Sequence, residues 1–204
     1  GFDVNFGRTT WGHPKSYFSP YKNPYLKDGP KGEHLPERLG RDVANWIKEN
    51  SKSPFFVYLP FYSVHTPIQA PENLTAKYEK KAPDGSHKNP KYAAMIDAMD
   101  QAVGHILKSL DDQKLAKNTL VIFTSDNGPY GSISRAEPLR GVKGMYYEGG
   151  IREPFLVRFP GVVEAGSKNE TPIAQIDLYP TFLELAGQTE PAGLDGVSLL
   201  PAFK

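Results

Sequence analysis

The chain has 204 residues, a formal net charge of +1 and no cysteine, with 39% hydrophobic and 23% charged residues. This balance is typical of a soluble globular protein, and a near-neutral charge without a long Lys/Arg run argues against a nucleic-acid partner. The sequence excludes disulfides, thiolate metal sites and a cysteine nucleophile within these residues, and no apolar run approaches the roughly 20 residues of a transmembrane helix.

Apolar residues at three- to four-residue spacing predict helices, and short runs of β-branched and aromatic residues predict strands. The expected helices cover residues 36–50, 91–110 and 175–186, with a short one ending at Tyr78, and the expected strands cover residues 54–59, 119–124 and 155–159. This order predicts an α/β fold. Residues 1–35 have weak periodicity and three strands make a small sheet, so we expect part of the domain to be missing.

The first candidate site follows the expected strand over residues 119–124. That strand runs directly into Ser125, Asp126, Asn127 and Gly128. Ligands gather at the carboxyl ends of strands in open α/β sheets, and the side-chain oxygens of Asp126 and Asn127 suit a hard divalent cation. The alternative is an ordinary turn, because Asn-Gly is among the commonest turn dipeptides.

A second candidate is His65, which follows the expected strand over residues 54–59. Histidine is the side chain best suited to proton transfer near neutral pH. A loop histidine whose ring bonds a backbone group is the alternative. The remaining histidines show no spacing that indicates a set of metal ligands.

Two charged segments complete the set of candidates. Lys143 lies in a glycine-flanked loop, where the backbone can approach a sulfate or phosphate and the ammonium can neutralise it, although most lysines are simply solvated. Glu148 and Arg152 are spaced to form an ion pair that braces the loop, and anion binding by Arg152 is the lesser alternative.

Taken in order, these segments resemble the sulfatase family of the alkaline phosphatase superfamily. The matching segments are residues 54–59, 64–67, 119–129, 139–144, 147–154, 160–161, 177–181 and 194–198. Each motif is weak by itself, but their order is specific. The resemblance implies a partial alkaline-phosphatase-like mixed sheet flanked by helices and missing its N-terminal portion. Residues 1–190 would form part of the catalytic domain, and residues 191–204 a connector toward an absent C-terminal subdomain.

The resemblance also implies roles for the candidate residues. Asp126 and Asn127 would complete an oxygen shell around Ca²⁺, with Mg²⁺ as the alternative ion. His65 would meet the bridging ester oxygen as a general acid or a sulfate contact, and Lys143 with Arg152 would bind the sulfate. The family's formylglycine nucleophile arises from a Cys/Ser-x-Pro-x-Arg motif that these residues lack, as they lack the N-terminal Asp pair for the metal.

We therefore expect part of a sulfuric ester hydrolase that acts on a sulfated carbohydrate or a small aryl ester and is inactive as the fragment alone. A phosphoryl-transfer hydrolase of the same superfamily is one alternative, although such enzymes favour two metals held by several histidines. A non-catalytic module that binds a cation or a sulfated glycan is the other. The resemblance implies a periplasmic or secreted protein and leaves the oligomeric state open.

Overall fold

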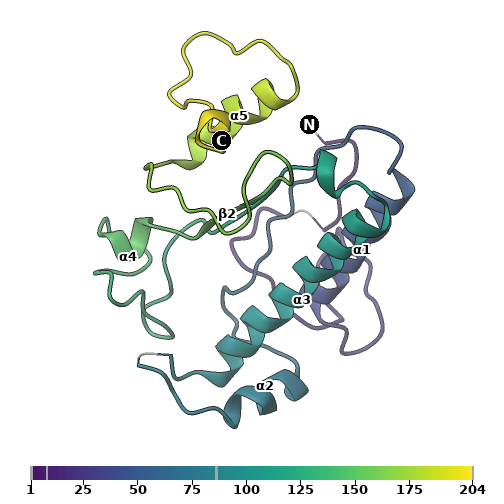
Figure 1. Cartoon of the computed structure of the whole chain (residues 1–204). Coiled ribbons are helices and arrows are strands. Elements are labelled where there is room, and N and C mark those ends of the chain that lie inside the picture. The colour runs from purple at the N-terminus through teal and green to yellow at the C-terminus, as the bar shows by residue number, and fades with distance from the viewer. Residues whose placement is uncertain (1, 8, 86, 204) are drawn as a thin grey trace. The chain divides into compact units, whose positions relative to one another are not determined.

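The computed structural model describes residues 2–7, 9–85 and 87–203, which form two compact units (Figure 1). Unit 1 comprises Gly1–Leu115 and Thr124–Phe155, and unit 2 comprises Ala116–Phe123 and Leu156–Lys204. The helices of unit 1 are α1 (Leu35–Glu49), α2 (Glu72–Glu79), α3 (Pro90–Asp112) and α4 (Glu148–Ile151). Unit 2 contains α5 (Leu178–Leu185) and the short 3-10 helices η1 (Ala116–Asn118), η2 (Gln175–Asp177) and η3 (Leu200–Phe203).

Strands β1 (Val121–Thr124) and β2 (Phe155–Arg158) form a two-stranded sheet that belongs to unit 2 except for one end residue of each strand. The predicted α/β class is confirmed, and the predicted helices and the later two strands are all found. The strand predicted over residues 54–59 is wrong, because this segment has no regular secondary structure and pairs with no strand in the described part of the chain. Its side chains still alternate between half-buried and exposed, as in a strand.

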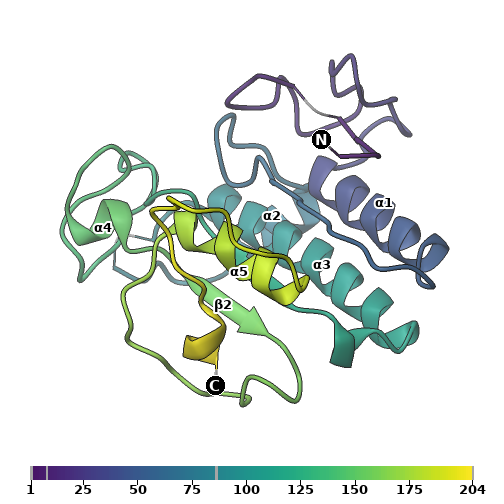
Figure 2. The same cartoon turned by 90° about the horizontal axis from the view of Figure 1, so that it is seen from above.

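Helices α1 and α3 lie side by side, and α2 packs against α3 (Figures 1 and 2). Pro36 is placed in the first turn of α1, where a missing amide costs no hydrogen bond. The side chain of Asn89 caps α3 by accepting from the Tyr92 amide at 3.0 Å. The two helices approach closely at Gly40 of α1, because a Cβ there would lie 2.8 Å from both the Cβ and the carbonyl oxygen of Ala102.

We expect Gly40→Ala to destabilise the protein by about 1–3 kcal/mol, since the added methyl must push the two helices apart. Gly104→Ala is the matched control, because a Cβ at Gly104 would meet nothing within 4 Å. That control should be neutral or stabilising by up to about 1 kcal/mol, as alanine is the better helix former. Urea unfolding of both variants checks this. Equal stability of the two variants would show that the helices are not in close contact at Gly40.

The irregular N-terminal residues contribute to the core of unit 1. Tyr17 and Tyr21 are fully buried, and their cluster includes Leu26, Leu35, Leu39 and Met95, with half-buried residues from 59–70 packed against it. The segment is held by backbone hydrogen bonds, among them those from the Leu35 amide to the Tyr17 carbonyl and from the Ser19 amide to the Glu33 carbonyl. The segment expected to be a loop is therefore ordered, and its residues from Tyr17 onward pack into the core of unit 1.

His34 is buried in this core beside the rings of Tyr17 and Phe18. Its Nε2 lies 3.4 Å from the Gln69 carbonyl oxygen, whereas its buried Nδ1 has no hydrogen-bond partner among the described residues. Burial lowers the pKa of His34 to about 4, because the charged form loses its hydration. The native fold therefore holds a neutral imidazole.

We expect the free energy of unfolding to fall as the pH drops from about 6.5 to about 4, because the unfolded chain takes up the proton that buried His34 refuses. The full effect of this group is on the order of 3 kcal/mol. His34→Gln keeps a donor for Gln69 and removes the titration, so its stability should depend less on pH over this range. Urea unfolding between pH 7 and pH 5 measures the difference, and an equal pH dependence in both proteins would contradict it.

In unit 2, the buried carboxylate of Asp177 joins α5 to the C-terminal segment. It accepts from the Ala174 amide at 2.7 Å and from the Val197 amide at 2.9 Å. Thr181 continues the link, since its hydroxyl donates to the Asp177 carbonyl and accepts from the Leu199 amide. Two of the family-like segments, residues 177–181 and 194–198, are thus bonded to each other and serve a structural role.

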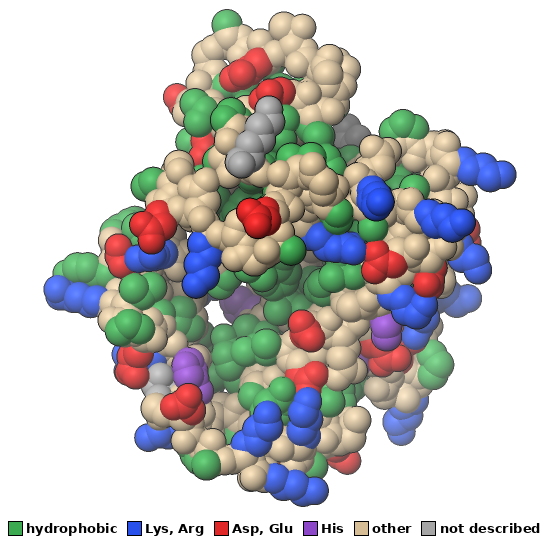
Figure 3. Space-filling view, viewed as in Figure 1, with side chains coloured by type: hydrophobic (Ala, Val, Ile, Leu, Met, Phe, Trp, Pro, Cys, Tyr) green, Lys and Arg blue, Asp and Glu red, His purple; other side chains and the backbone are tan. Residues whose placement is uncertain are grey.

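Charges of both signs are intermixed on the face shown in Figure 3, as the net charge of +1 leads one to expect. Among the described residues, no helix has both the length and the apolar character needed to cross a bilayer.

Candidate functional site

The turn after β1 is bonded to both of the charged segments singled out in the sequence. The Gly128 amide donates to the Gly150 carbonyl at 3.1 Å, which joins the turn to α4. The Lys143 amide donates to the Pro129 carbonyl at 3.0 Å. Asp126, Asn127, Lys143 and α4 therefore belong to one connected loop structure within unit 1.

Glycines make this connection tight. A Cβ at Gly128 would overlap the carbonyl oxygen of Gly149, and a Cβ at Gly149 would overlap the carbonyl oxygen of Gly141. The Gly149 amide also donates to the Arg140 carbonyl at 2.7 Å. The backbones approach more closely than any side chain at these positions permits, so the glycines fix where Lys143 and Asp126 lie relative to each other.

Glu153 lies near Asp126 and was not singled out from the sequence. Burial, and then the negative charge of Asp126, raise the pKa of Glu153. Its Oε1 is buried and has no hydrogen-bond partner among the described residues. A carboxylate oxygen left without a donor beside a second carboxylate fits a bound cation, since a cation would offset both charges.

The described residues do not make a complete metal site, because no group of three or more His, Cys, Asp or Glu side chains is gathered in them. Asn127 adds an amide beside Asp126, and its Nδ2 donates to the Gly128 carbonyl at 3.0 Å. Asp126, Asn127 and Glu153 by themselves are too few side chains for a complete metal site.

Arg152 forms the ion pair predicted with Glu148, with 3.4 Å between Nη1 and Oε2. Both side chains are more than half exposed, so the pair contributes less than about 1 kcal/mol. Lys143, which belongs to the same loop structure, is also exposed. The same loop structure thus carries two exposed cationic side chains.

His65 lies apart from this loop in a second cluster, with Tyr17, Tyr62 and Thr66. Its Nδ1 lies 3.1 Å from the Thr66 carbonyl oxygen and 3.2 Å from the Thr66 hydroxyl oxygen, so Thr66 occupies this nitrogen and Nε2 is the nitrogen left for a ligand. The Tyr17 hydroxyl donates to the His65 carbonyl at 3.0 Å, and the His65 amide donates to the Tyr62 carbonyl. No hydrogen bond, ion pair or ring contact among the described residues joins His65 to the loop that carries Asp126 and Lys143.

His13 stacks on His65, with ring centroids 5.9 Å apart and planes at 17°. The spacing of the histidines gave no sign of this pair, because the contact depends on how residues 9–17 fold back over residues 62–69. Only the tertiary structure reveals it.

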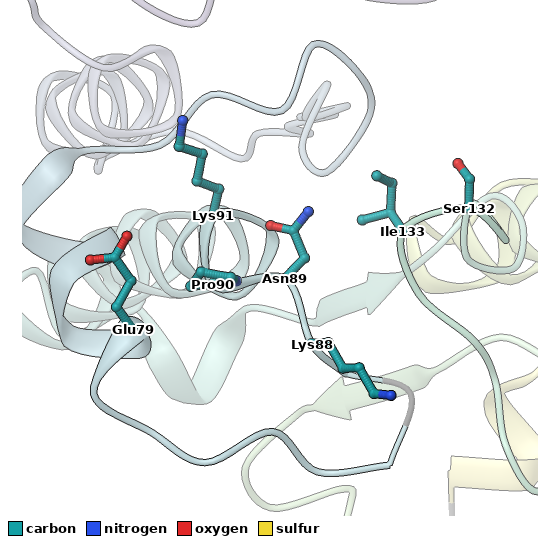
Figure 4. A pocket seen from close by; sticks show the side chains of 7 residues that line it. All are labelled: Glu79, Lys88, Asn89, Pro90, Lys91, Ser132 and Ile133. Carbon is teal, nitrogen blue, oxygen red and sulfur yellow. The ribbon is translucent and has the colours of Figure 1, made fainter.

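An open pocket of about 460 Å³ lies elsewhere in unit 1 (Figure 4). It is lined by Glu79, Lys88, Asn89, Pro90, Lys91, Ser132 and Ile133. Figure 4 shows the side chains of Glu79 and Lys88 pointing in different directions. None of the candidate residues lines it, so the pocket is separate from the candidate site.

Comparison with known proteins decides the family. The model of a family described as Sulfatase matches residues 1–188. The chain belongs to the sulfatase family. A protein named Sulfatase from Formosa agariphila is 43% identical to it over 199 residues, which cover 89% of this chain and 36% of the relative. The human steryl-sulfatase is 34% identical over 183 residues, which cover 84% of this chain and 30% of that protein.

Solved structures agree with this sulfatase assignment in fold. The crystal structure of Ps i-CgsB in complex with k-i-k-neocarrahexaose matches with a TM-score of 0.77 and 36% identity, covering 87% of this chain and 40% of that chain. The chain therefore spans 40% or less of the length of each of these three proteins. This agrees with the expectation that the residues here form one part of an alkaline-phosphatase-like domain.

Proposed function

We propose that this chain supplies part of the active site of a sulfuric ester hydrolase. The observation that carries the proposal is the hydrogen bond from the Lys143 amide to the Pro129 carbonyl, which ties a cationic side chain to the Asp126 turn. A sulfate ester needs both features: positive charge for its oxygens, and carboxylates to hold the cation that polarises it.

Asp126 and Asn127 would hold the cation, Ca²⁺ or alternatively Mg²⁺, through their side-chain oxygens. The unpartnered Oε1 of Glu153 supports a positive charge at this place. A bound cation would supply Lewis-acid polarisation of the sulfate oxygens. The other ligands, and a formylglycine nucleophile, are expected outside these residues.

Lys143 would bind a sulfate oxygen, and its charge would stabilise the negative charge that builds up as the ester bond breaks. Arg152 would assist by attracting the anion, since its ion pair with Glu148 is exposed and easily exchanged. His65 would present Nε2 to the bridging oxygen. In the doubly protonated ring, Nε2–H would donate its proton to the leaving alcohol. Nδ1–H would meanwhile keep its hydrogen bond to the Thr66 carbonyl.

A sulfated carbohydrate is the substrate class we favour over a small aryl sulfate. The support is the structural neighbour solved with an oligosaccharide, k-i-k-neocarrahexaose, at 36% identity. A protein acting on such a polymer would work where the polymer is, so we propose a periplasmic or secreted location.

The test uses the longer protein that contains this chain. It should release inorganic sulfate from a sulfated oligosaccharide and from 4-nitrophenyl sulfate, and much less phosphate from 4-nitrophenyl phosphate. Ion chromatography measures both anions. Preferential phosphate release would favour the phosphoryl-transfer alternative, and oligosaccharide binding without release of either anion would favour a binding module.

A further inference from the structure

We propose that His13 contacts the substrate beside His65 and binds a second anionic substituent of a polyanionic saccharide. This inference rests on the proposed sulfatase function. It names a residue that would make the enzyme prefer substrates with more than one anionic group. The two imidazoles are stacked at 5.9 Å, and His13 is exposed whereas His65 is half-buried. His13 therefore lies on the solvent side of the pair, where the part of a ligand beyond the reacting ester would pass.

The position of His13 is fixed on both sides of it in the sequence. Thr9 Oγ1 lies 2.5 Å from the Tyr62 hydroxyl oxygen. Tyr17, which is fully buried, donates its hydroxyl to the His65 carbonyl and its amide to Gln69 Oε1 at 2.9 Å. Residues 9–17 are thus held along residues 62–69, and His13 is carried between these two attachments.

The two rings are also oriented alike. The Nδ1 of His13 lies 3.2 Å from the Pro14 carbonyl oxygen, as the Nδ1 of His65 lies 3.1 Å from the Thr66 carbonyl oxygen. Each Nδ1 thus lies against the residue that follows it, and in neither ring does Nε2 form a hydrogen bond among the described residues, so Nε2 is left to meet a ligand. A ligand with two anionic groups can engage both rings when each Nε2 carries a proton, because an unprotonated Nε2 only accepts, whereas a protonated ring forms a strong charge-assisted hydrogen bond to an anion.

Neighbouring charge favours an anion at this place. The ammonium of Lys15 lies 4.3 Å from the centre of the Trp11 ring, so the segment that carries His13 also carries a cation. A simple aryl sulfate carries one anionic group, which the reacting site itself uses, so it leaves His13 without a partner.

The experiment compares His13→Ala and His13→Gln in the longer protein that contains this chain. On an oligosaccharide with at least two sulfates, His13→Ala should raise KM about tenfold with kcat nearly unchanged, since one charge-assisted hydrogen bond is lost. His13→Gln should recover part of that loss, because an amide can still donate. On 4-nitrophenyl sulfate both variants should stay within about twofold of wild type. His105→Ala, an exposed histidine on α3, is the control and should change neither substrate.

Unchanged kinetics on the oligosaccharide would overturn the inference. Equal losses on both substrates would also overturn it, because they would mean that His13 acts only by supporting His65. If the wild-type protein releases no sulfate from either substrate, the proposed function fails by itself. The inference is then judged by calorimetry, and an oligosaccharide Kd that His13→Ala leaves unchanged would refute it.

Discussion

His65→Gln is expected to lower kcat/KM for a sulfated sugar by about 10²–10⁴-fold, the usual contribution of a positioned general acid. The same change should cost much less on 4-nitrophenyl sulfate, because nitrophenolate leaves without being protonated. The glutamine fits the half-buried position and can still bond the Thr66 carbonyl, so the effect should not come from unfolding.

The comparison of the two leaving groups makes this result specific. A residue that only binds sulfate would lower the rates for both substrates alike, since both carry the same sulfate group. His105→Gln serves as the control for loss of an imidazole elsewhere on the surface. An equal loss on the sugar and the aryl ester would assign His65 to sulfate binding, and no loss on either would remove it from the site.

Lys143→Ala is expected to lower kcat by about 10²–10³-fold, the cost typical of removing one group that stabilises transition-state charge. Lys143→Arg should recover only part of the rate, because a planar guanidinium does not reproduce the point charge of an ammonium. Lys143 is exposed and its structural bond is made by its backbone amide, so neither variant should change the unfolding midpoint.

The matched control is Lys168→Ala, an exposed lysine of unit 2, which should leave the kinetics unchanged. If Lys143→Ala behaves like this control, Lys143 is an ordinary solvated lysine. The glycines around it would then serve only the folding of the loop.

The sequence predicted the helices well because each carries its own pattern of buried positions. The helix expected over residues 36–50 is α1, Leu35–Glu49, and of the apolar positions that gave the pattern it buries all but Trp46, which is half-buried. The segment over residues 54–59 carries a strand pattern just as clearly, yet it pairs with no strand in the described chain. A strand depends on a neighbour, and its own residues do not specify whether that neighbour is present.

In the candidate site, too, some features follow from the local sequence and others only from the tertiary structure. The position of Asp126 at the end of a strand and the glycines around Lys143 are local signals, and backbone hydrogen bonds do join these segments. The approach of Glu153 to Asp126 and the stacking of His13 on His65 depend on tertiary folding. Sequence spacing predicts contacts only between residues that are close in the chain. Glu153 and His13 were therefore not predicted as site residues.

The most direct measurement compares sulfate release by the pure 204-residue chain with release by the longer protein, after mass spectrometry has established formylglycine in the latter. The 204 residues contain no Cys/Ser-x-Pro-x-Arg motif from which formylglycine could be made, so the proposed cation and sulfate contacts would lack their nucleophile. We therefore predict sulfate release by the longer protein and none by the 204 residues alone. Release of sulfate by the isolated chain would contradict the account, because catalysis would then need no residue beyond those described.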